Sequence, residues 1–289
     1  MGPVQRIFLG DVQGCADELD ELIARARDAY GTRCELWCVG DVVNRGPESL
    51  RALATVREVV DAGRGRCVLG NHELTLLRVA FGLRDLLPLD TFGEVLVGPD
   101  ASEWIEWLRR RRLVETGRLG KQRFAMVHAA VHPKWSLDEL VQRARRVEAR
   151  LGHRDRREAV RLLEADPALD SDRDLLGRLT SCRSVGAGDE WSTSPPAESG
   201  LAPWHERWAA RGHRWGVAYG HWSLQGLHVA AGLRGLDTGC VHHGRGRDGF
   251  LTAWLPDPSA DEPFAAPDHA FWQVRARRAY YAHRDAPEA

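Results

Sequence analysis

The chain has 289 residues and 43% of them are hydrophobic, which is enough for one domain with a sizeable core. Lysine plus arginine (40) nearly balances aspartate plus glutamate (41), so the formal net charge of −1 neither favours nor excludes a nucleic-acid partner. No stretch of about 18 apolar residues occurs, which excludes a membrane-spanning helix, and the N-terminus lacks the features of a signal peptide. We therefore expect a cytoplasmic protein without a membrane partner.

Five short apolar runs, spread from the N-terminus to residue 219, each end in a small polar cluster. Runs of this length are typical of buried strands rather than of helices. In chain order they are Val4–Leu9 before Gly10-Asp11, Leu36–Val39 before Gly40-Asp41, Cys67–Leu69 before Gly70-Asn71-His72-Glu73, Phe124–Val127 before His128, and Val217–Tyr219 before Gly220-His221.

Helical patterns over Asp17–Tyr30 and Pro47–Ala62 separate the first three runs. Strands that alternate with helices predict β-α-β units, an α/β fold and a sheet rich in parallel strands. Ligands of such sheets bind outside the carboxyl ends of the strands. We therefore expect one crevice to collect the side chains at these strand ends, namely Asp11, Asp41, Asn71 and His128.

The middle of the chain is expected to be helical and to cover one rim of the fold. The helical patterns there are Leu74–Phe81, Ser102–Arg112, Ser136–Leu151 and Arg156–Leu163. We expect insertions at about 83–118 and 133–214, and a loop over Arg183–Gly200, which is rich in serine, glycine and proline. Strand-like runs return at Gly226–Leu236 and Phe250–Trp254, so residues 1–255 are expected to form the main domain and residues 256–289 a loosely packed extension.

Six cysteines are present and none forms a C-x-x-C pair, a pattern that does not favour a structural zinc site. Cys34, Cys38 and Cys67 lie in or beside apolar runs. We expect them to be small buried residues in a reducing compartment.

The polar clusters offer six candidate metal ligands with hard oxygen and nitrogen donors: Asp11, Gln13, Asp41, Asn71, His128 and His221. Such a set suits two divalent ions, manganese foremost, with cobalt, iron or zinc as alternatives. Two ions about 4 Å apart clamp a phosphoryl oxygen and make a water acidic enough to attack, and Asp41 could bridge them. An aspartate at a strand end is more often a turn residue. A turn has no need of Gly-Asn-His-Glu, however, so the clusters together favour a metal site.

Arg45 and His72 are candidates for handling phosphate beside these ligands. Arg45 lies four residues after Asp41, and its guanidinium could grip phosphoryl oxygens; a surface arginine in a turn is the alternative. His72 directly follows Asn71 and could donate a proton to the leaving oxygen; a core histidine is the alternative.

Taken in order, these segments resemble the calcineurin-like metallophosphoesterase superfamily, and within it the phosphoprotein-phosphatase-type branch. Its pattern is Asp-x-His, Gly-Asp-x-x-Asp-Arg-Gly, Gly-Asn-His-Asp/Glu and two later histidines. The matching segments here are Asp11-Val12-Gln13, Gly40-Asp41-Val42-Val43-Asn44-Arg45-Gly46, Gly70-Asn71-His72-Glu73, His128 and Gly220-His221. The resemblance implies a β-sandwich of two mixed sheets flanked by helices, with a helical rim insertion.

The resemblance also implies roles for single residues. One metal would be held by Asp11, Gln13 and Asp41 and the other by Asp41, Asn71, His128 and His221. His72 would act as general acid, oriented by Asn44, and Arg45 would bind phosphate. Asn71 would also contact the substrate.

A further similarity, to the symmetrical diadenosine tetraphosphatases, covers most of the chain. It includes the segments Gly10–Cys15, Asn44–Leu50, Val127–Ala129, His132–Trp135, Gly220–Trp222 and Gly235–Cys240. Those enzymes hydrolyse diadenosine tetraphosphate to two molecules of ADP. Stacking of bases on rim tryptophans would suit such a substrate. The rim tryptophans Trp104, Trp107, Trp204, Trp208 and Trp215 are nevertheless more often core residues.

Several positions depart from these family patterns. Gln13 replaces a histidine and is a weaker, neutral ligand. Asn44 replaces an aspartate; it could accept a hydrogen bond from the catalytic imidazole but cannot raise its pKa by charge. Glu73 stands where the tetraphosphatases usually have aspartate. His242 and His243 stand where a Trp-Gly-Gly element is expected, and we interpret them as exposed loop residues rather than as substrate or metal contacts.

The sequence leaves several functions open. Arg183 is a candidate for a second phosphate-binding arginine, which would suit a dinucleoside polyphosphate. Removal of nucleoside-tetraphosphate caps from the 5' end of RNA would use the same chemistry. A serine/threonine or tyrosine protein phosphatase is the main alternative, supported by Gly-Asn-His-Glu. A binding protein with a degenerate centre is the third, supported only by Gln13 and Asn44. The sequence does not indicate an oligomeric state.

Overall fold

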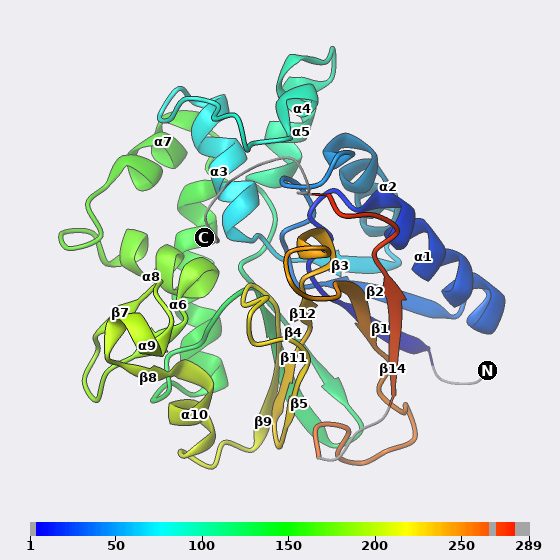
Figure 1. The fold of residues 1–289 in the computed structure, drawn as a ribbon. Coiled ribbons are helices and arrows are strands. Elements are labelled where there is room, and N and C mark those ends of the chain that lie inside the picture. The colour runs from blue at the N-terminus through cyan, green and yellow to red at the C-terminus, as the bar shows by residue number, and fades with distance from the viewer. Residues whose placement is uncertain (1–3, 266–269, 281–289) are drawn as a thin grey trace.

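The computed structural model describes residues 4–265 and 270–280, and its centre is a pair of β-sheets (Figure 1). The first sheet has the order β12-β13-β1-β2-β3, with β14 paired to β13, and the second has the order β10-β11-β9-β5-β4. The strands of the first are β1 (Gln5–Leu9), β2 (Cys34–Cys38), β3 (Gly65–Cys67), β12 (Asp237–Thr238), β13 (Phe250–Trp254) and β14 (Phe271–Arg275). Those of the second are β4 (Val114–Leu119), β5 (Gln122–Val127), β9 (Trp215–Tyr219), β10 (His228–Ala230) and β11 (Leu233–Gly235). The expected α/β fold of two mixed sheets is confirmed.

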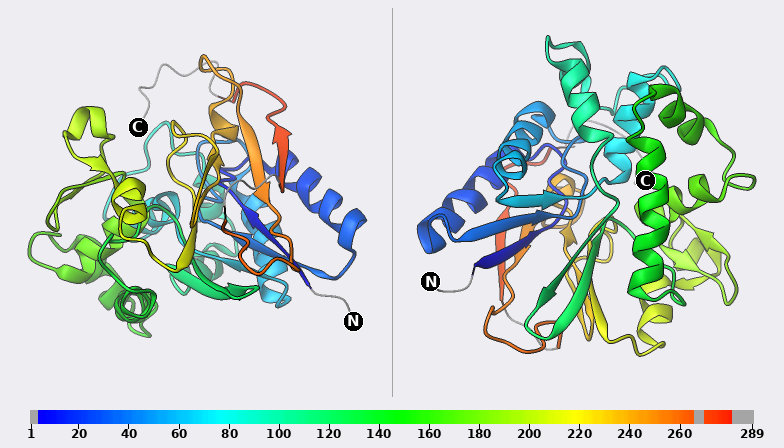
Figure 2. Two further views of the ribbon diagram at one scale, coloured as in Figure 1. Left: turned by 90° about the horizontal axis from the view of Figure 1, so that it is seen from below. Right: turned by 180° about the vertical axis from the view of Figure 1, so that it is seen from behind.

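The parallel half of the first sheet is built from the expected β-α-β units. Strands β1, β2 and β3 pair in parallel, with Ile7 opposite Leu36 and Leu36 opposite Gly65. The connecting helices are α1 (Ala16–Tyr30) and α2 (Ser49–Asp61), and each buries one apolar face. Both helices lie on the side of this sheet that faces away from the second sheet (Figure 2).

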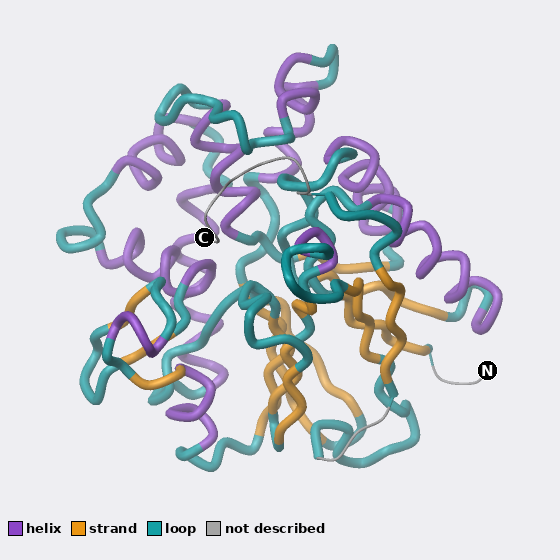
Figure 3. Tube along the Cα trace, viewed as in Figure 1, coloured by secondary structure: helices purple, strands orange, loops and turns teal. Residues whose placement is uncertain are grey.

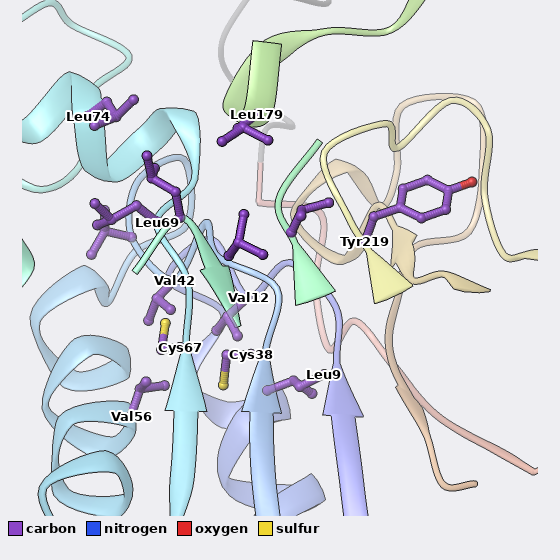
Figure 4. Close-up of a cluster of buried hydrophobic side chains, with 14 of the residues drawn as sticks. Leu9, Val12, Cys38, Val42, Val56, Cys67, Leu69, Leu74, Leu179 and Tyr219 are labelled. Atoms are coloured by element: carbon purple, nitrogen blue, oxygen red, sulfur yellow. The ribbon is translucent and has the colours of Figure 1, made fainter. Parts of the chain in front are cut away.

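Aromatic side chains fill the space between the two sheets. The ring of Phe8 in β1 lies 5.2 Å from that of Phe124 in β5 and 5.0 Å from that of Trp254 in β13, and all three residues are fully buried. On the other face of the first sheet, Cys38 and Cys67 lie opposite each other on β2 and β3 and belong to the core cluster that includes Val56 of α2 (Figure 4). Both are buried and free, as expected of small apolar residues, whereas Cys34 is only half-buried, so the expectation is wrong for that residue.

Helices form the rim expected from the middle of the chain. They are α3 (Asn71–Ala80), α4 (Gly93–Val97), α5 (Ala101–Leu108), α6 (Leu137–Leu151), α7 (Arg156–Glu164), α8 (Ser171–Ser181), α9 (Pro196–Ser199) and α10 (Trp204–Ala209). Figure 3 shows the loops at the strand ends meeting this rim near the middle of the molecule. No helix in the described ranges is both long enough and apolar enough to cross a membrane.

The expected loop over residues 183–200 is partly wrong. Strands β6 (Ser184–Val185) and β7 (Trp191–Ser192) pair within it, and β8 (Ala202–Pro203) joins them in a three-stranded antiparallel sheet. Strands of two residues are too short for an alternating pattern, so the sequence gives no sign of them.

The tail is more firmly packed than the sequence indicates. Strand β14 pairs antiparallel with β13 along its length, and Trp272 stacks on Tyr30 of α1 with ring centroids 6.0 Å apart. Further on, the backbone N–H of Arg277 and the hydroxyl of Tyr280 each donate to the Glu18 carboxylate at 2.7 Å. The expectation of loose packing is therefore wrong for residues 271–280, while a domain boundary after residue 255 stays a prediction. Residues 281–289 lie outside the described part.

Candidate metal centre

The loops that follow β1, β2, β3, β5 and β9 converge on one buried place, as the strand-end clusters indicated. Backbone hydrogen bonds join these loops directly. The N–H groups of Val12 and Gln13 donate to the Asp41 carbonyl at 3.1 and 2.8 Å, and the N–H of Gly220 donates to the His128 carbonyl at 2.8 Å. The crevice is therefore held together by main-chain bonds before any side chain is considered.

Unusual backbone conformations are concentrated in these loops. In the part of the chain that the structure describes, every non-glycine residue with a positive φ lies here: Gln13 (47°), Asp41 (48°), Asn44 (79°), Arg45 (66°) and His221 (70°). Each such conformation costs on the order of 1–2 kcal/mol and persists only where its surroundings impose it. A cluster of this kind is typical of a functional site.

At two positions directly before site residues, Gly70 and Gly220, there is no room for a side chain. A Cβ atom on Gly70 would lie 2.0 Å from Oδ1 of Asp41, and one on Gly220 would lie 1.9 Å from Oδ1 of Asp11. Any larger residue would push the carboxylate aside. Glycine therefore allows the backbone of one loop to approach the carboxylate of another.

Asp41, His128 and His221 offer buried ligand atoms that lie within 4.8 Å of one another. Backbone carbonyls fix the tautomer of both rings. Nδ1 of His128 lies 2.9 Å from the Val39 carbonyl oxygen, and Nε2 of His221 lies 3.1 Å from that of Ser181, so each of these nitrogens carries its hydrogen. The other nitrogen of each ring then presents a lone pair to the cluster.

The Asn71 amide completes this group. Its inner atom, placed as the oxygen, lies 2.9 Å from Nδ1 of His221, 3.0 Å from Nε2 of His128 and 3.2 Å from Oδ2 of Asp41. With the amide nitrogen at this position, Asn71 would donate to these three atoms; with the oxygen there, four lone-pair donors face one another with no hydrogen between them. A cation at their centre would turn mutual repulsion into ligand bonds, and two oxygens with two imidazole nitrogens suit a divalent ion.

Asp11 and Gln13 bring further donors from the loop after β1. Both oxygens of the buried Asp11 carboxylate lie 3.2 Å from the backbone N–H of His221. Oε1 of Gln13 is buried and has no hydrogen-bond partner among the described residues. An unsatisfied buried acceptor costs about 1–3 kcal/mol, so this oxygen also fits a cation ligand.

Four buried carboxylates crowd the centre, and two of them, Glu73 and Asp237, were not among the predicted site residues. Burial, followed by the charges of Asp237 and Asp41, raises the pKa of Asp11 well above its usual value. Burial also raises the pKa of Asp237 to about 6 and, together with the charge of Asp41, that of Glu73 to about 7. Such a concentration of negative charge requires cations, so two divalent ions fit the residues present.

Glu73 holds the loop after β2 in place. Its carboxylate accepts the backbone N–H groups of Asp41 at 2.9 Å, Val42 at 2.8 Å, Val43 at 3.2 Å and Gly70 at 2.8 Å. The side chain therefore ties the Asp41 loop to the start of α3. Its position in the Gly-Asn-His-Glu cluster was the only sequence signal for it.

His72 points its Nε2 atom toward Oδ2 of Asp41, 3.7 Å away, and its Nδ1 lies 2.9 Å from the amide nitrogen of Asn44. Oδ1 of Asn44 accepts the N–H groups of Arg45 at 2.8 Å and Thr91 at 3.0 Å. The amide nitrogen must therefore face His72 and donate to it. The expectation that Asn44 accepts this bond is wrong, because two backbone donors already occupy its oxygen. Burial lowers the pKa of His72 to about 4.

Two arginines predicted to bind phosphate border the buried donors. Arg45 is half-buried, and its guanidinium lies 3.4 Å from the Leu89 carbonyl. Arg183 donates to the Thr193 carbonyl at 2.7 Å. After burial, the charge of Arg183 is the next cause that lowers the pKa of His221, so this arginine lies near the ligand cluster.

The histidine pair at 242 and 243 is half-buried, so the expectation of an exposed loop is wrong. Burial, then the charges of Arg247 and Arg245, lowers the pKa of His242 to about 3, and His72 and Arg45 contribute to the same shift. Nδ1 of His243 accepts the Gly249 N–H at 3.1 Å. The 3₁₀-helix η1 (Cys240–His242) turns this segment inward toward the centre.

Comparisons with known proteins agree with this geometry. Residues 6–176 match the family described as calcineurin-like phosphoesterase. A symmetrical bis(5'-nucleosyl)-tetraphosphatase from Janthinobacterium sp. (strain Marseille) is 37% identical over 252 residues, which cover 82% of this chain and 89% of the relative.

Two solved structures share the fold. One is of a protein proposed to be a diadenosine tetraphosphatase, with a TM-score of 0.62, 20% identity and 94% of each chain covered. The other is a serine/threonine phosphatase from Saccharomyces cerevisiae, with a TM-score of 0.53, 13% identity and 94% of this chain and 79% of that chain covered.

Proposed function

The chain belongs to the calcineurin-like phosphoesterase family, and we propose that it is a metal-dependent hydrolase that cleaves dinucleoside tetraphosphates symmetrically, so that diadenosine tetraphosphate gives two molecules of ADP. The observation that carries this proposal is the buried group of lone-pair donors around Asp41, in a chain whose relatives of that name match it over most of its length. The protein-phosphatase alternative has support only from the Gly-Asn-His-Glu cluster and from a shared fold at 13% identity.

We propose two ion sites that share Asp41. Asp11 and Gln13 would complete one, and Asn71, His128 and His221 the other. When bound, the two ions supply positive charge at the phosphoryl oxygens and lower the pKa of the attacking water. The hard donor set favours manganese, with cobalt, iron or zinc as alternatives, and the neutral amide of Gln13 makes its ion the more weakly held.

The remaining side chains would bind the phosphates and assist the leaving group. Arg45 and Arg183 would pair with the phosphate chain, since a guanidinium binds phosphate through two parallel N–H groups. Asn44 donates to Nδ1 of His72, which keeps the ring hydrogen on Nε2, where it would meet the departing oxygen. A departing phosphate has a pKa of about 6 and needs little more than this hydrogen bond at neutral pH.

Product analysis tests the proposed reaction. The manganese-loaded protein would be given diadenosine tetraphosphate, a phosphoserine peptide and an RNA with a nucleoside-tetraphosphate cap in separate assays. We expect ADP as the only nucleotide product from the dinucleotide, and little phosphate from the peptide. Formation of ATP and AMP would contradict symmetrical cleavage, and rapid dephosphorylation of the peptide with an intact dinucleotide would establish a protein phosphatase. Cleavage of the capped RNA would extend the proposal to RNA ends.

A further inference from the structure

Most of the tryptophans considered for base stacking are core residues. Trp204 and Trp208 are 1% exposed, and Trp107 and Trp215 are 7% exposed. Trp222 differs because it is half-buried and directly follows the ligand-type residue His221. Consecutive Cα atoms lie about 3.8 Å apart, so the backbone of Trp222 lies at the edge of the metal centre.

The loop that begins with Trp222 exposes other apolar groups. Leu224 is 56% exposed and Leu227 is 37% exposed, and both belong to the loop 222–227 between β9 and β10. The imidazole of His205, from α10, lies 5.8 Å from the Trp222 ring at an angle of 52°. The loop that begins next to His221 therefore carries aromatic and exposed apolar side chains.

The face of Trp222 is less occupied than those of other half-buried tryptophans. Arg143 lies over Trp135 at 4.6 Å, and Arg25 lies over Trp272 at 4.4 Å. Within residues 4–265 and 270–280, no cation and no ring other than His205 packs on the Trp222 indole. The Trp222 ring, on the residue next to His221, therefore has a face to offer a ligand.

Hydrogen bonds hold the loop in a fixed shape. Arg247 donates to the carbonyl of Ser223 at 2.7 Å and to its hydroxyl at 3.1 Å. The Tyr219 hydroxyl donates to Oε1 of Gln225 at 3.0 Å, and the Gln225 N–H donates to the Trp222 carbonyl at 2.9 Å. A surface that is ordered before binding loses little entropy when a ligand arrives.

We propose that Trp222, Leu224 and Leu227 form a base-binding surface, on which the base of one nucleoside diphosphate unit stacks while its phosphates reach the metal centre. This inference rests on the proposed function, because it takes the ligand to be a nucleotide. Every base has a flat π face, so the surface distinguishes nucleotides from inorganic or peptide phosphate more than one base from another.

Binding measurements on the manganese-loaded protein test this surface without requiring turnover. Isothermal titration would compare ADP with pyrophosphate, which has no base, for the wild type, Trp222→Leu and Trp222→Phe. We expect Trp222→Leu to raise the Kd for ADP on the order of 5- to 150-fold and Trp222→Phe to raise it less. The Kd for pyrophosphate should stay unchanged in both. Trp104→Leu, on α5, is the matched control and should change neither value.

Three results would overturn the base-binding surface. The first is equal ADP affinity in the wild type and Trp222→Leu, and the second is wild-type binding of ADP no tighter than of pyrophosphate. The third is a parallel loss of ADP and pyrophosphate binding, which would assign Trp222 to support of His221. A protein that binds ADP through Trp222 but leaves the dinucleotide intact would instead contradict the proposed function and retain the surface.

Discussion

Single hydrogen bonds determine what the histidines of this centre can do. Carbonyl groups opposite His128 and His221 leave the inner nitrogen of each ring with a lone pair, as a metal ligand requires. The partner of His72 acts in the opposite way. The amide of Asn44 donates to Nδ1 of the ring, so the ring hydrogen of His72 stays on Nε2. The same residue type therefore fits two roles, ligand and hydrogen-bond donor, according to its partner.

Replacement of His72 by asparagine tests whether the His72 ring donates its hydrogen to the leaving oxygen. We expect His72→Asn to reduce hydrolysis of the dinucleotide about tenfold, because a phosphate leaves readily, and to reduce that of an alkyl phosphate ester by about 10²–10⁴-fold. Metal content should not change, since His72 is not a proposed ligand. Measurements of kcat on both substrates and of bound metal would check this, with the exposed His153→Asn as control. An equal loss on both substrates would remove His72 from the leaving-group role.

At the residue scale the sequence predicted the donor atoms better than the bonds between them. The motif spacing marked Asp11, Asp41 and His128, since ligand residues follow strand ends. It did not mark Asp237 as a fourth carboxylate, because that residue begins the two-residue strand β12, which is too short to show a pattern. Nor could it give the direction of the Asn44 bond, which depends on the backbone of Thr91, 47 residues away.

Among the structural elements, the short loops after the strands depend most on particular residue types. Gly70 lies between β3 and α3, and Asp41 follows β2, so the two segments meet only when the sheet has formed. The main chain of one then approaches the carboxylate of the other, which accepts the N–H of His72 at 2.9 Å. These contacts make the loop geometry a condition for metal binding.

Gly70→Ala should therefore cost metal binding more than it costs helix stability. Its Cβ would meet Oδ1 of Asp41 at 2.0 Å, so the carboxylate must move from the shared ligand position. We expect manganese affinity to fall by at least tenfold, measured by titration of the metal-free protein. Gly98→Ala is a matched control, since its nearest contact is 3.4 Å and its φ is −70°. Unchanged metal affinity in Gly70→Ala would show that Asp41 is not confined as described.

Helices with a clear hydrophobic periodicity were predicted from the sequence, and short strands without such a periodicity were missed. The amphipathic patterns behind α1, α2, α6 and α7 extend over several turns, so their positions followed from the sequence. The two-residue strands β6 and β7 carry no period. Strand β14 follows a segment rich in proline and alanine, and its place depends on pairing with β13, a contact that no local pattern reveals.

On the scale of the whole molecule, the two sheets bring like charges together at one end of the core. The buried carboxylates of Asp11, Asp41, Glu73 and Asp237 come from four segments that are far apart in the sequence. In the metal-free protein their mutual repulsion and their burial oppose folding, and bound cations would relieve both. Stability should therefore depend on metal and on pH together.

The raised pKa of Glu73 indicates in which direction its contribution to the unfolding free energy changes with pH. Its pKa is raised from 4.5 to about 7, so the folded metal-free protein binds a proton more tightly than the unfolded chain does. The resulting stability is full below about pH 4.5 and is lost as the pH rises through about 7. The lowered pKa of His72 acts in the opposite direction, because the unfolded imidazole still binds protons up to about pH 7.5. The lowered pKa values of five further histidines act in the same way: His132, His205, His221, His228 and His242.

Urea unfolding of the chelator-treated wild type and Glu73→Gln between pH 6.5 and 8 isolates the Glu73 contribution, because the histidines titrate alike in both proteins. Over this range we expect the wild type to lose about 1 kcal/mol of unfolding free energy relative to Glu73→Gln, the part of the Glu73 contribution that remains above pH 6.5. Glu73→Gln has no proton to release at this position. Added manganese should raise stability most at pH 8, where the carboxylates are ionised and bind cations best. Parallel pH profiles of the metal-free wild type and Glu73→Gln from pH 6.5 to 8 would contradict the raised pKa of Glu73, and with it the inference that buried negative charge at this centre requires cations.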